Sequence, residues 1–266
     1  MTEHSTIERT EQPGTRASLS ADLTRLGLPR GATVLVHSSL SALGWVAGGP
    51  VAVVQALLDV IGPDGTLVMP SFSGDLSEPS IWQHPPVPEH WWPVIRAQTP
   101  AFDPLTTPTR MMGHVAETFR TWPGTRRSAH PQSSVAALGP QAEFITAQHP
   151  LADSMGEGSP FARLYDLNAW VLLLGTERNS SLHLAEHRSG LRGQVRQGAP
   201  VMVNGERIWA EFGDLEYDDD SFPAVKAAFE ASGAVRVGQV GAGTARLMHQ
   251  RELVDFAVAY WEAGAS

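Results

Sequence analysis

Hydrophobic positions recur with two different periods along the chain. Short apolar runs at residues 33–37, 66–70, 134–138 and 169–174 predict buried strands. Residues 19–26, 51–61 and 222–231 instead carry apolar side chains three and four positions apart, which predicts helices. Strand, helix and strand at this spacing indicate a parallel crossover unit. We therefore expect an α/β protein with three layers, α/β/α, and a mainly parallel central sheet.

The end of the chain predicts a β-hairpin followed by a helical extension. Asn204-Gly205 separates residues 201–203 from residues 207–212, and Asn-Gly suits the positive φ angles of a type I′ turn. Residues 234–239 then indicate a short strand, and residues 244–261 a last helix.

Two segments lack either period. Residues 74–108 are rich in Pro and Trp, and an irregular excursion of this length usually serves a site or a partner. Residues 1–18 are polar and lack the apolar core of a signal peptide, so we expect a disordered tail. The remaining residues, 19–266, are enough for one core, which predicts a single domain with an insertion at 74–108.

Composition narrows the classes of function. The chain has no cysteine, which excludes disulfides and thiolate catalysis and leaves His, Asp and Glu as possible metal ligands. No apolar run approaches the roughly 20 residues that span a bilayer, so we expect a cytoplasmic protein without membrane contact. The net charge of -9 argues against a nucleic-acid partner and is compatible with a cationic ligand. Acidic residues concentrate at 211–220, where no base occurs.

The helix expected after the strand at 169–174 carries the most distinctive chemistry. His183, Glu186 and His187 share one face of that helix, because residues three and four apart are neighbours. His183 and Glu186 could form a proton-handling pair. Residues 183–187 also fit the His-x-x-Glu-His pattern of inverted zincins, in which both histidines bind zinc. The pattern alone leaves an acid–base pair and half a metal site as alternatives.

Polar residues also follow the expected strands at the edge where ligands of open α/β sheets bind. These are His37-Ser38-Ser39-Leu40 and Ser71-Phe72-Ser73. Hydroxyls and free backbone N–H groups there can hold a phosphate or an oxyanion, or can simply cap and turn the chain. Arg110, near the start of a further expected helix, could pair with a phosphate.

Several motifs, in this order, resemble the aminoglycoside 3-N-acetyltransferase family over residues 33–188. They are Val34-Leu-Val-His-Ser-Ser, Gly65-Thr-Leu-Val-Met-Pro-Ser, Thr107-Pro-Thr-Arg, Arg127-Ser-Ala-His-Pro, Gly158-Ser-Pro, Val171-Leu-Leu-Leu-Gly and Ser181-Leu-His-Leu-Ala-Glu-His. The family's fold differs from that of histone-acetyltransferase-like enzymes. The resemblance implies acetyl transfer from acetyl-CoA to the 3-amino group of a 2-deoxystreptamine antibiotic, and hence antibiotic resistance, with His183 and Glu186 at the chemical centre.

The resemblance also implies where coenzyme A binds. It assigns that contact to the three loops that contain His37, Ser38, Ser39, Leu40, Ser71, Ser73, Arg110, Met112 and Gly113. With these assignments, His183 serves as general base, Glu186 orients it, and the amine attacks the thioester directly, with no metal required. The ammonium groups of the antibiotic would meet carboxylates, for which the candidates are Asp75, Glu216, Asp218, Asp219 and Asp220.

Three alternatives remain at this stage. One is a zinc metallopeptidase of the inverted type, which needs His187 as a ligand. Another is the same acyl transfer to a different amine, because a fold does not determine the acceptor. The third is a protein that binds coenzyme A or a cation without turnover. The sequence is compatible with a monomer or a dimer.

Overall fold

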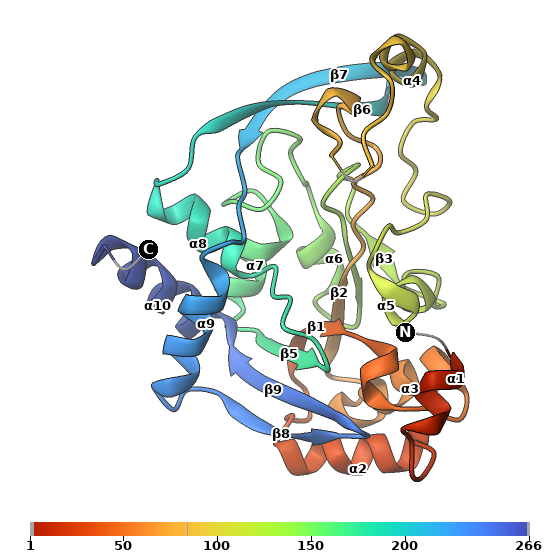
Figure 1. The fold of residues 1–266 in the computed structure, drawn as a ribbon, viewed down its shortest axis with the longest axis vertical. Coiled ribbons are helices and arrows are strands. Elements are labelled where there is room, and N and C mark those ends of the chain that lie inside the picture. Colours follow the sequence, from red (N-terminus) through yellow and green to blue (C-terminus); the bar gives the residue numbers. More distant parts are fainter. Residues whose placement is uncertain (1–2, 84, 265–266) are drawn as a thin grey trace.

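A seven-stranded sheet forms the centre of the molecule (Figure 1). The computed structural model describes residues 3–83 and 85–264. In spatial order the strands are β3 (Arg126–Arg127), β4 (Val135–Leu138), β2 (Thr66–Pro70), β1 (Thr33–Ser38), β5 (Trp170–Leu174), β9 (Gly243–His249) and β8 (Arg236–Val240). Strands β2, β1 and β5 are parallel, whereas β4 and β9 run the opposite way. Because β3 and β8 are in turn antiparallel to β4 and β9, five of these seven strands share one direction.

Helices cover both faces of this sheet, which confirms the expected α/β fold with three layers. One face packs on α2 (Arg16–Leu26), α3 (Gly49–Ile61) and α5 (Gly113–Arg120). The other face packs on α6 (Ala142–Thr146), α7 (Pro160–Asp166), α8 (Leu182–Ser189), α9 (Phe222–Ala231) and α10 (Gln250–Glu262). Val34 and Val36 of β1 point to the first core, and Leu35 points to the second. Burial on both faces explains why the central strands are apolar runs and not alternating patterns.

The predicted hairpin is present and is longer than the sequence pattern indicated. Strands β6 (Gln194–Val203) and β7 (Glu206–Leu215) form a separate two-stranded sheet. Asn204 and Gly205 connect them with φ angles of 52° and 84°, as the type I′ turn requires. The hairpin extends over the top of the molecule to α4 (Trp92–Gln98) in the insertion (Figure 1). The insertion also contains two 3-10 turns, η2 (Pro79–Ile81) and η3 (Glu89–Trp91); a third, η1 (Leu40–Leu43), follows β1.

The prediction of one helix over 244–261 is wrong in its first part. Residues Gly243–His249 form β9, and α10 starts only at Gln250. Ala245 and Leu247 pack on the first core, while Thr244 is exposed, so this segment has the period of a strand. Pairing with β5 on one side and β8 on the other provides hydrogen-bond partners for the backbone of this segment. This pairing makes it a strand although the helical spacing of the following residues suggested a helix.

The segment expected to be a disordered tail differs as well. Glu3–Glu8 form α1, in which Thr6 is buried, and α2 begins at Arg16, before the expected boundary. Thr15 and Ser18 form a reciprocal capping box: Ser18 N donates to Thr15 Oγ1 (3.1 Å), and Thr15 N donates to Ser18 Oγ (2.9 Å). The expectation of disorder is therefore wrong for the helical residues 3–8 and 16–18. The single-domain assignment stays a prediction.

Candidate active site

A short turn connects the carboxyl end of β5 to α8. Gly175 leaves the strand with φ 64°, and Asn179 Oδ1 accepts a hydrogen bond from Ser181 N (3.1 Å) just before the helix. Leu182, Leu184 and Ala185 are buried in the core under the helix. This anchoring sets the first turn of α8 at the edge of the sheet where β1 also ends.

His183 and Glu186 form the hydrogen-bonded pair that the sequence predicted. His183 Nδ1 lies 2.6 Å from Glu186 Oε2, and the Glu186 side chain is only 1% exposed. A carboxylate oxygen can only accept, so Nδ1 carries a proton, and in the neutral imidazole the lone pair is then on Nε2. The His183 side chain is 17% exposed and lines a cavity, so a base is available to a bound molecule.

The second oxygen of Glu186 is also satisfied. Oε1 accepts from Arg192 Nε (2.9 Å) and from Asp218 N (3.1 Å). Because a buried carboxylate is costly unless paired and hydrogen-bonded, these contacts offset the cost of burying the Glu186 side chain.

Aromatic rings determine the orientation of the His183 imidazole. The ring of Tyr217 lies edge-on at 5.1 Å between centroids, and that of Phe222 lies at 4.9 Å. Burial raises the pKa of the Tyr217 hydroxyl, which therefore stays neutral and accepts from Met155 N (3.2 Å). Tyr217 and Phe222 thus restrict the ring without competing for its proton.

The cavity beside His183 has a volume of about 1280 Å³. This exceeds the 300–1,000 Å³ of an ordinary small-molecule site, so two substrates can lie in it together. Its wall comes from the end of β1, the start of α3, the Met111–His114 turn, the turn before α8 and the start of α9. Glu3 and Thr6 of α1 also contribute to the wall.

His37 lies in this wall with an unused donor. Ser180 N donates to His37 Nε2 (3.0 Å), which leaves the proton on Nδ1. Burial, with a smaller contribution from His183, lowers the pKa of His37 to about 3, so the ring is neutral. Its buried Nδ1 has no hydrogen-bond partner among the described residues. A bound carbonyl or phosphate oxygen could supply the missing acceptor.

The residues predicted to bind coenzyme A fall into two groups. His37, Ser38, Ser39, Leu40, Met112 and Gly113 line the cavity. Ser71 and Ser73 are fully buried outside its lining, where the Ser73 hydroxyl donates to Pro131 O (2.7 Å). Arg110 is also outside that lining and lies 3.9 Å from Asp75. For all nine residues, contact with coenzyme A stays a prediction.

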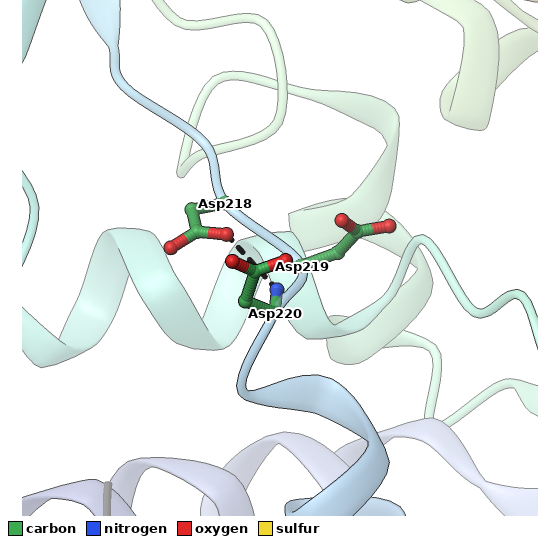
Figure 2. A group of neighbouring side chains, drawn as sticks. All are labelled: Asp218, Asp219 and Asp220. Atoms are coloured by element: carbon green, nitrogen blue, oxygen red, sulfur yellow. Dashed lines mark hydrogen bonds between the residues drawn. The ribbon is translucent and has the colours of Figure 1, made fainter.

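The acidic residues predicted to bind an antibiotic do not all lie at the cavity. Figure 2 shows Asp218, Asp219 and Asp220 together on the loop between β7 and α9, beside α8. Asp219 lines the cavity, whereas Asp218 holds Arg192 and accepts from Asp220 N (2.9 Å). Glu216 and Asp75 lie outside the cavity lining.

The two histidines of the zinc alternative have different partners. His187 Nε2 lies 3.6 Å from Asp153 Oδ1, while His183 Nδ1 is engaged by Glu186. Across residues 3–83 and 85–264, Asp218, Asp219 and Asp220 are the one group of three or more potential ligands gathered within 4.8 Å. The structure therefore does not bring His183 and His187 together with a third ligand.

Sequence reasoning missed several residues of this site. Arg192 follows Gly190, which ends α8 with φ 65°, so helical spacing could not place it beside Glu186. Asn179 and Ser180 line the cavity from the turn before α8, and Lys226 lines it from α9. The turn before α8 held the only available signal, because it follows a strand at the ligand-binding edge of the sheet.

Comparison with known proteins gives consistent results. A family model described as aminoglycoside 3-N-acetyltransferase matches residues 35–262. The chain is 48% identical over 254 residues to the SPbeta prophage-derived aminoglycoside N(3')-acetyltransferase-like protein YokD of Bacillus subtilis (strain 168), covering 94% of this chain and 93% of that protein. It is 40% identical to aminoglycoside N(3)-acetyltransferase VII of Streptomyces paromomycinus, covering 98% and 96%.

Solved structures show the same similarity. The crystal structure of YokD from Bacillus subtilis superimposes with a TM-score of 0.95 at 46% identity and covers 97% of both chains. AAC-IIIb, solved as a binary complex with CoASH, gives 0.85 at 32% identity, covering 95% of this chain and 98% of that one. AAC-VIa bound to sisomicin gives 0.85 at 30% identity, covering 95% and 99%.

Proposed function

The chain belongs to the aminoglycoside 3-N-acetyltransferase family, whose members are acyltransferases that use acetyl-CoA, and on this premise we propose that it acetylates the 3-amino group of a 2-deoxystreptamine aminoglycoside. The single observation that carries the proposal is the His183–Glu186 pair, which opens onto a cavity large enough for both substrates. Such an activity would confer antibiotic resistance, and it belongs in the cytoplasm, where acetyl-CoA is available.

His183 is the proposed general base. An aliphatic amine is mostly protonated near neutral pH, and only its neutral form attacks a thioester. His183, which lines the cavity, accepts that proton on Nε2 directly or through a water. Glu186 keeps the proton of His183 on Nδ1 and stabilises the imidazolium that forms.

The transfer is proposed to be direct. The amine nitrogen attacks the thioester carbon, the tetrahedral intermediate collapses, and the carbon–sulfur bond breaks. The amine proton passes through His183 to the departing thiolate, which yields the amide and coenzyme A. Two features support direct transfer without an acyl-enzyme: the chain has no cysteine to act as the nucleophile, and a single cavity has room for both substrates.

The two substrates would occupy different walls of the cavity. Acetyl-CoA fits the wall built by the end of β1 and the Met111–His114 turn, where His37 offers a donor without a partner. The polycationic antibiotic would meet the part of the wall where Asp219 provides a carboxylate close to α8 (Figure 2). The reacting amine would then lie between these walls, next to His183.

The test is acetyl-CoA consumption against a panel of aminoglycosides, with the acetylated position of each product determined by NMR. We expect turnover with compounds that have a free 3-amino group and none with a matched compound whose 3-amino group is blocked. Equal turnover of the blocked compound would refute the regiochemistry. Turnover only of unrelated amines would show that the acceptor differs.

A further inference from the structure

Arg192 connects two parts of the site that the proposed mechanism uses separately. Its Nε donates to Glu186 Oε1 (2.9 Å). The other two nitrogens of the same guanidinium reach Asp218: Nη1 donates to the carboxylate Oδ2 and Nη2 to the backbone carbonyl, each at 3.0 Å. One planar group therefore spans the carboxylate that orients the base and the first residue of the acidic loop, Asp218–Asp220.

The acidic loop also contacts the Glu186 carboxylate directly. Asp218 N donates to Glu186 Oε1, so the backbone of the loop also contacts the pair (3.1 Å). Asp219, the next residue, lines the cavity (Figure 2). A displacement of Asp219 by a bound cation would therefore pull on Asp218 and, through Arg192, on Glu186.

Other charged groups around the pair do not provide this link. His37 faces it from β1 but is neutral, because burial lowers its pKa to about 3. Tyr217 contacts His183 and is also neutral, while Asp219 and Lys226 line the cavity without a hydrogen bond to either member of the pair among the described residues. In the part of the chain that the structure describes, Arg192 is the one cation hydrogen-bonded to Glu186.

We infer that Arg192 is a positioning residue that couples binding of the cationic acceptor at the acidic loop to the orientation of the His183 base. The inference rests on the proposed function. It assigns two separable tasks to one side chain. The positive charge pairs with the Glu186 carboxylate that orients His183, while the remaining guanidinium donors hold Asp218 and thereby the loop.

The experiment compares Arg192→Ala and Arg192→Lys with wild type and with Arg188→Ala. Arg188 is a matched control because it lies on α8 and pairs with a glutamate, Glu157 (2.7 Å), away from the base. For each protein, kcat and the KM of both substrates are measured with one accepted aminoglycoside across a range of pH. Circular dichroism monitors folding.

For Arg192→Ala we expect kcat to fall about 10- to 100-fold, part of the contribution of an oriented general base. The acid limb of the kcat/KM profile should move to higher pH, because loss of a neighbouring cation lets His183 hold its proton more tightly. The KM of the aminoglycoside should rise several-fold, while that of acetyl-CoA stays close to wild type. Lysine keeps the charge but not the fork, so Arg192→Lys should restore the acid limb while the aminoglycoside KM stays raised.

The inference is overturned if Arg192→Ala matches Arg188→Ala, or if it raises both KM values together without moving the acid limb. If Arg192→Ala does not fold, Arg192→Lys decides: an unchanged aminoglycoside KM in the folded lysine variant refutes the coupling. Absence of aminoglycoside turnover in wild type would instead refute the proposed function, so the two failures are distinguishable.

Discussion

At the scale of single residues, the chemistry of the site depends on which donor and acceptor atoms already have a hydrogen-bond partner. Glu186 is saturated by His183, Arg192 and the Asp218 backbone, whereas His183 Nε2 remains free. The pairing of His183 with Glu186 could be predicted, because residues three apart on a helix are neighbours. The contribution of Arg192 could not, because a left-handed Gly190 breaks the helix between them.

The residue-scale prediction concerns the two histidines of α8. His183→Gln should lower kcat by about 10²- to 10⁴-fold, because an amide cannot accept the amine proton. Binding of coenzyme A, measured by calorimetry, should persist, because His183 provides only a small part of the cavity wall.

His187→Gln is the matched control, because His187 contacts Asp153 and not Glu186. It should retain nearly all activity. Near-normal turnover in His183→Gln would disprove the base assignment. A comparable loss in His187→Gln, accompanied by loss of bound zinc, would favour the metallopeptidase alternative.

At the scale of elements, the spacing of apolar residues located most strands and helices. It failed where pairing with other strands determined the secondary structure. The runs that became β1, β2 and β5 have buried apolar side chains at their centres, as is typical of strands covered on both faces. Residues 243–249 could also be read as the start of α10, and only their place between β5 and β8 makes them a strand. The position of the acidic loop beside α8 likewise depends on how far the hairpin extends, which its turn alone does not reveal.

The acidic loop carries the element-scale prediction. Asp219→Asn should raise the aminoglycoside KM about two- to fivefold, as expected for loss of one exposed ion pair. The dependence of that KM on salt should become shallower, since fewer charges attract the polycation. The KM of acetyl-CoA should not change.

Glu206→Gln, at the tip of the hairpin, removes the same charge far from the cavity and should alter neither constant. If Asp219→Asn behaves like this control, the acidic loop does not bind the acceptor.

At the scale of the whole molecule, folding buries three histidines, His37, His130 and His149, in their neutral form. His149 accepts from the Ser128 hydroxyl (3.0 Å) and donates to Ser154 O (2.7 Å), while His130 accepts from two backbone N–H groups. Burial lowers the pKa of His130 to about 4 and that of His149 to about 3, and His37 has a similar value.

These three histidines predict how stability depends on pH. Below pH 6.5 these histidines bind protons in the unfolded chain but not in the folded protein. The free energy of unfolding therefore decreases as the pH is lowered, until the folded pKa values near 3 to 4 are reached. Each histidine contributes up to about 1.4 kcal/mol per pH unit in this window. Asp214, whose burial raises its carboxyl pKa, acts in the opposite direction.

Urea unfolding between pH 7 and pH 4.5 measures this slope. His149→Gln should make it shallower by about one histidine's share, whatever its effect on stability at pH 7. Carboxylates with lowered pKa, such as Glu117 at about 2, add to the loss only at lower pH. A slope that is flat from pH 6.5 to 4.5 would contradict the prediction.

Helix α1 has a practical consequence for anyone who labels or immobilises this protein. Glu3 and Thr6 form part of the cavity wall, so an affinity tag, fluorophore or surface linker attached ahead of them would start beside the cavity. Helix α10 ends at Glu262 on the other face of the sheet (Figure 1). Attachment after α10 keeps the probe away from the cavity, and kinetic constants obtained with an amino-terminal tag should be compared with those of the cleaved protein.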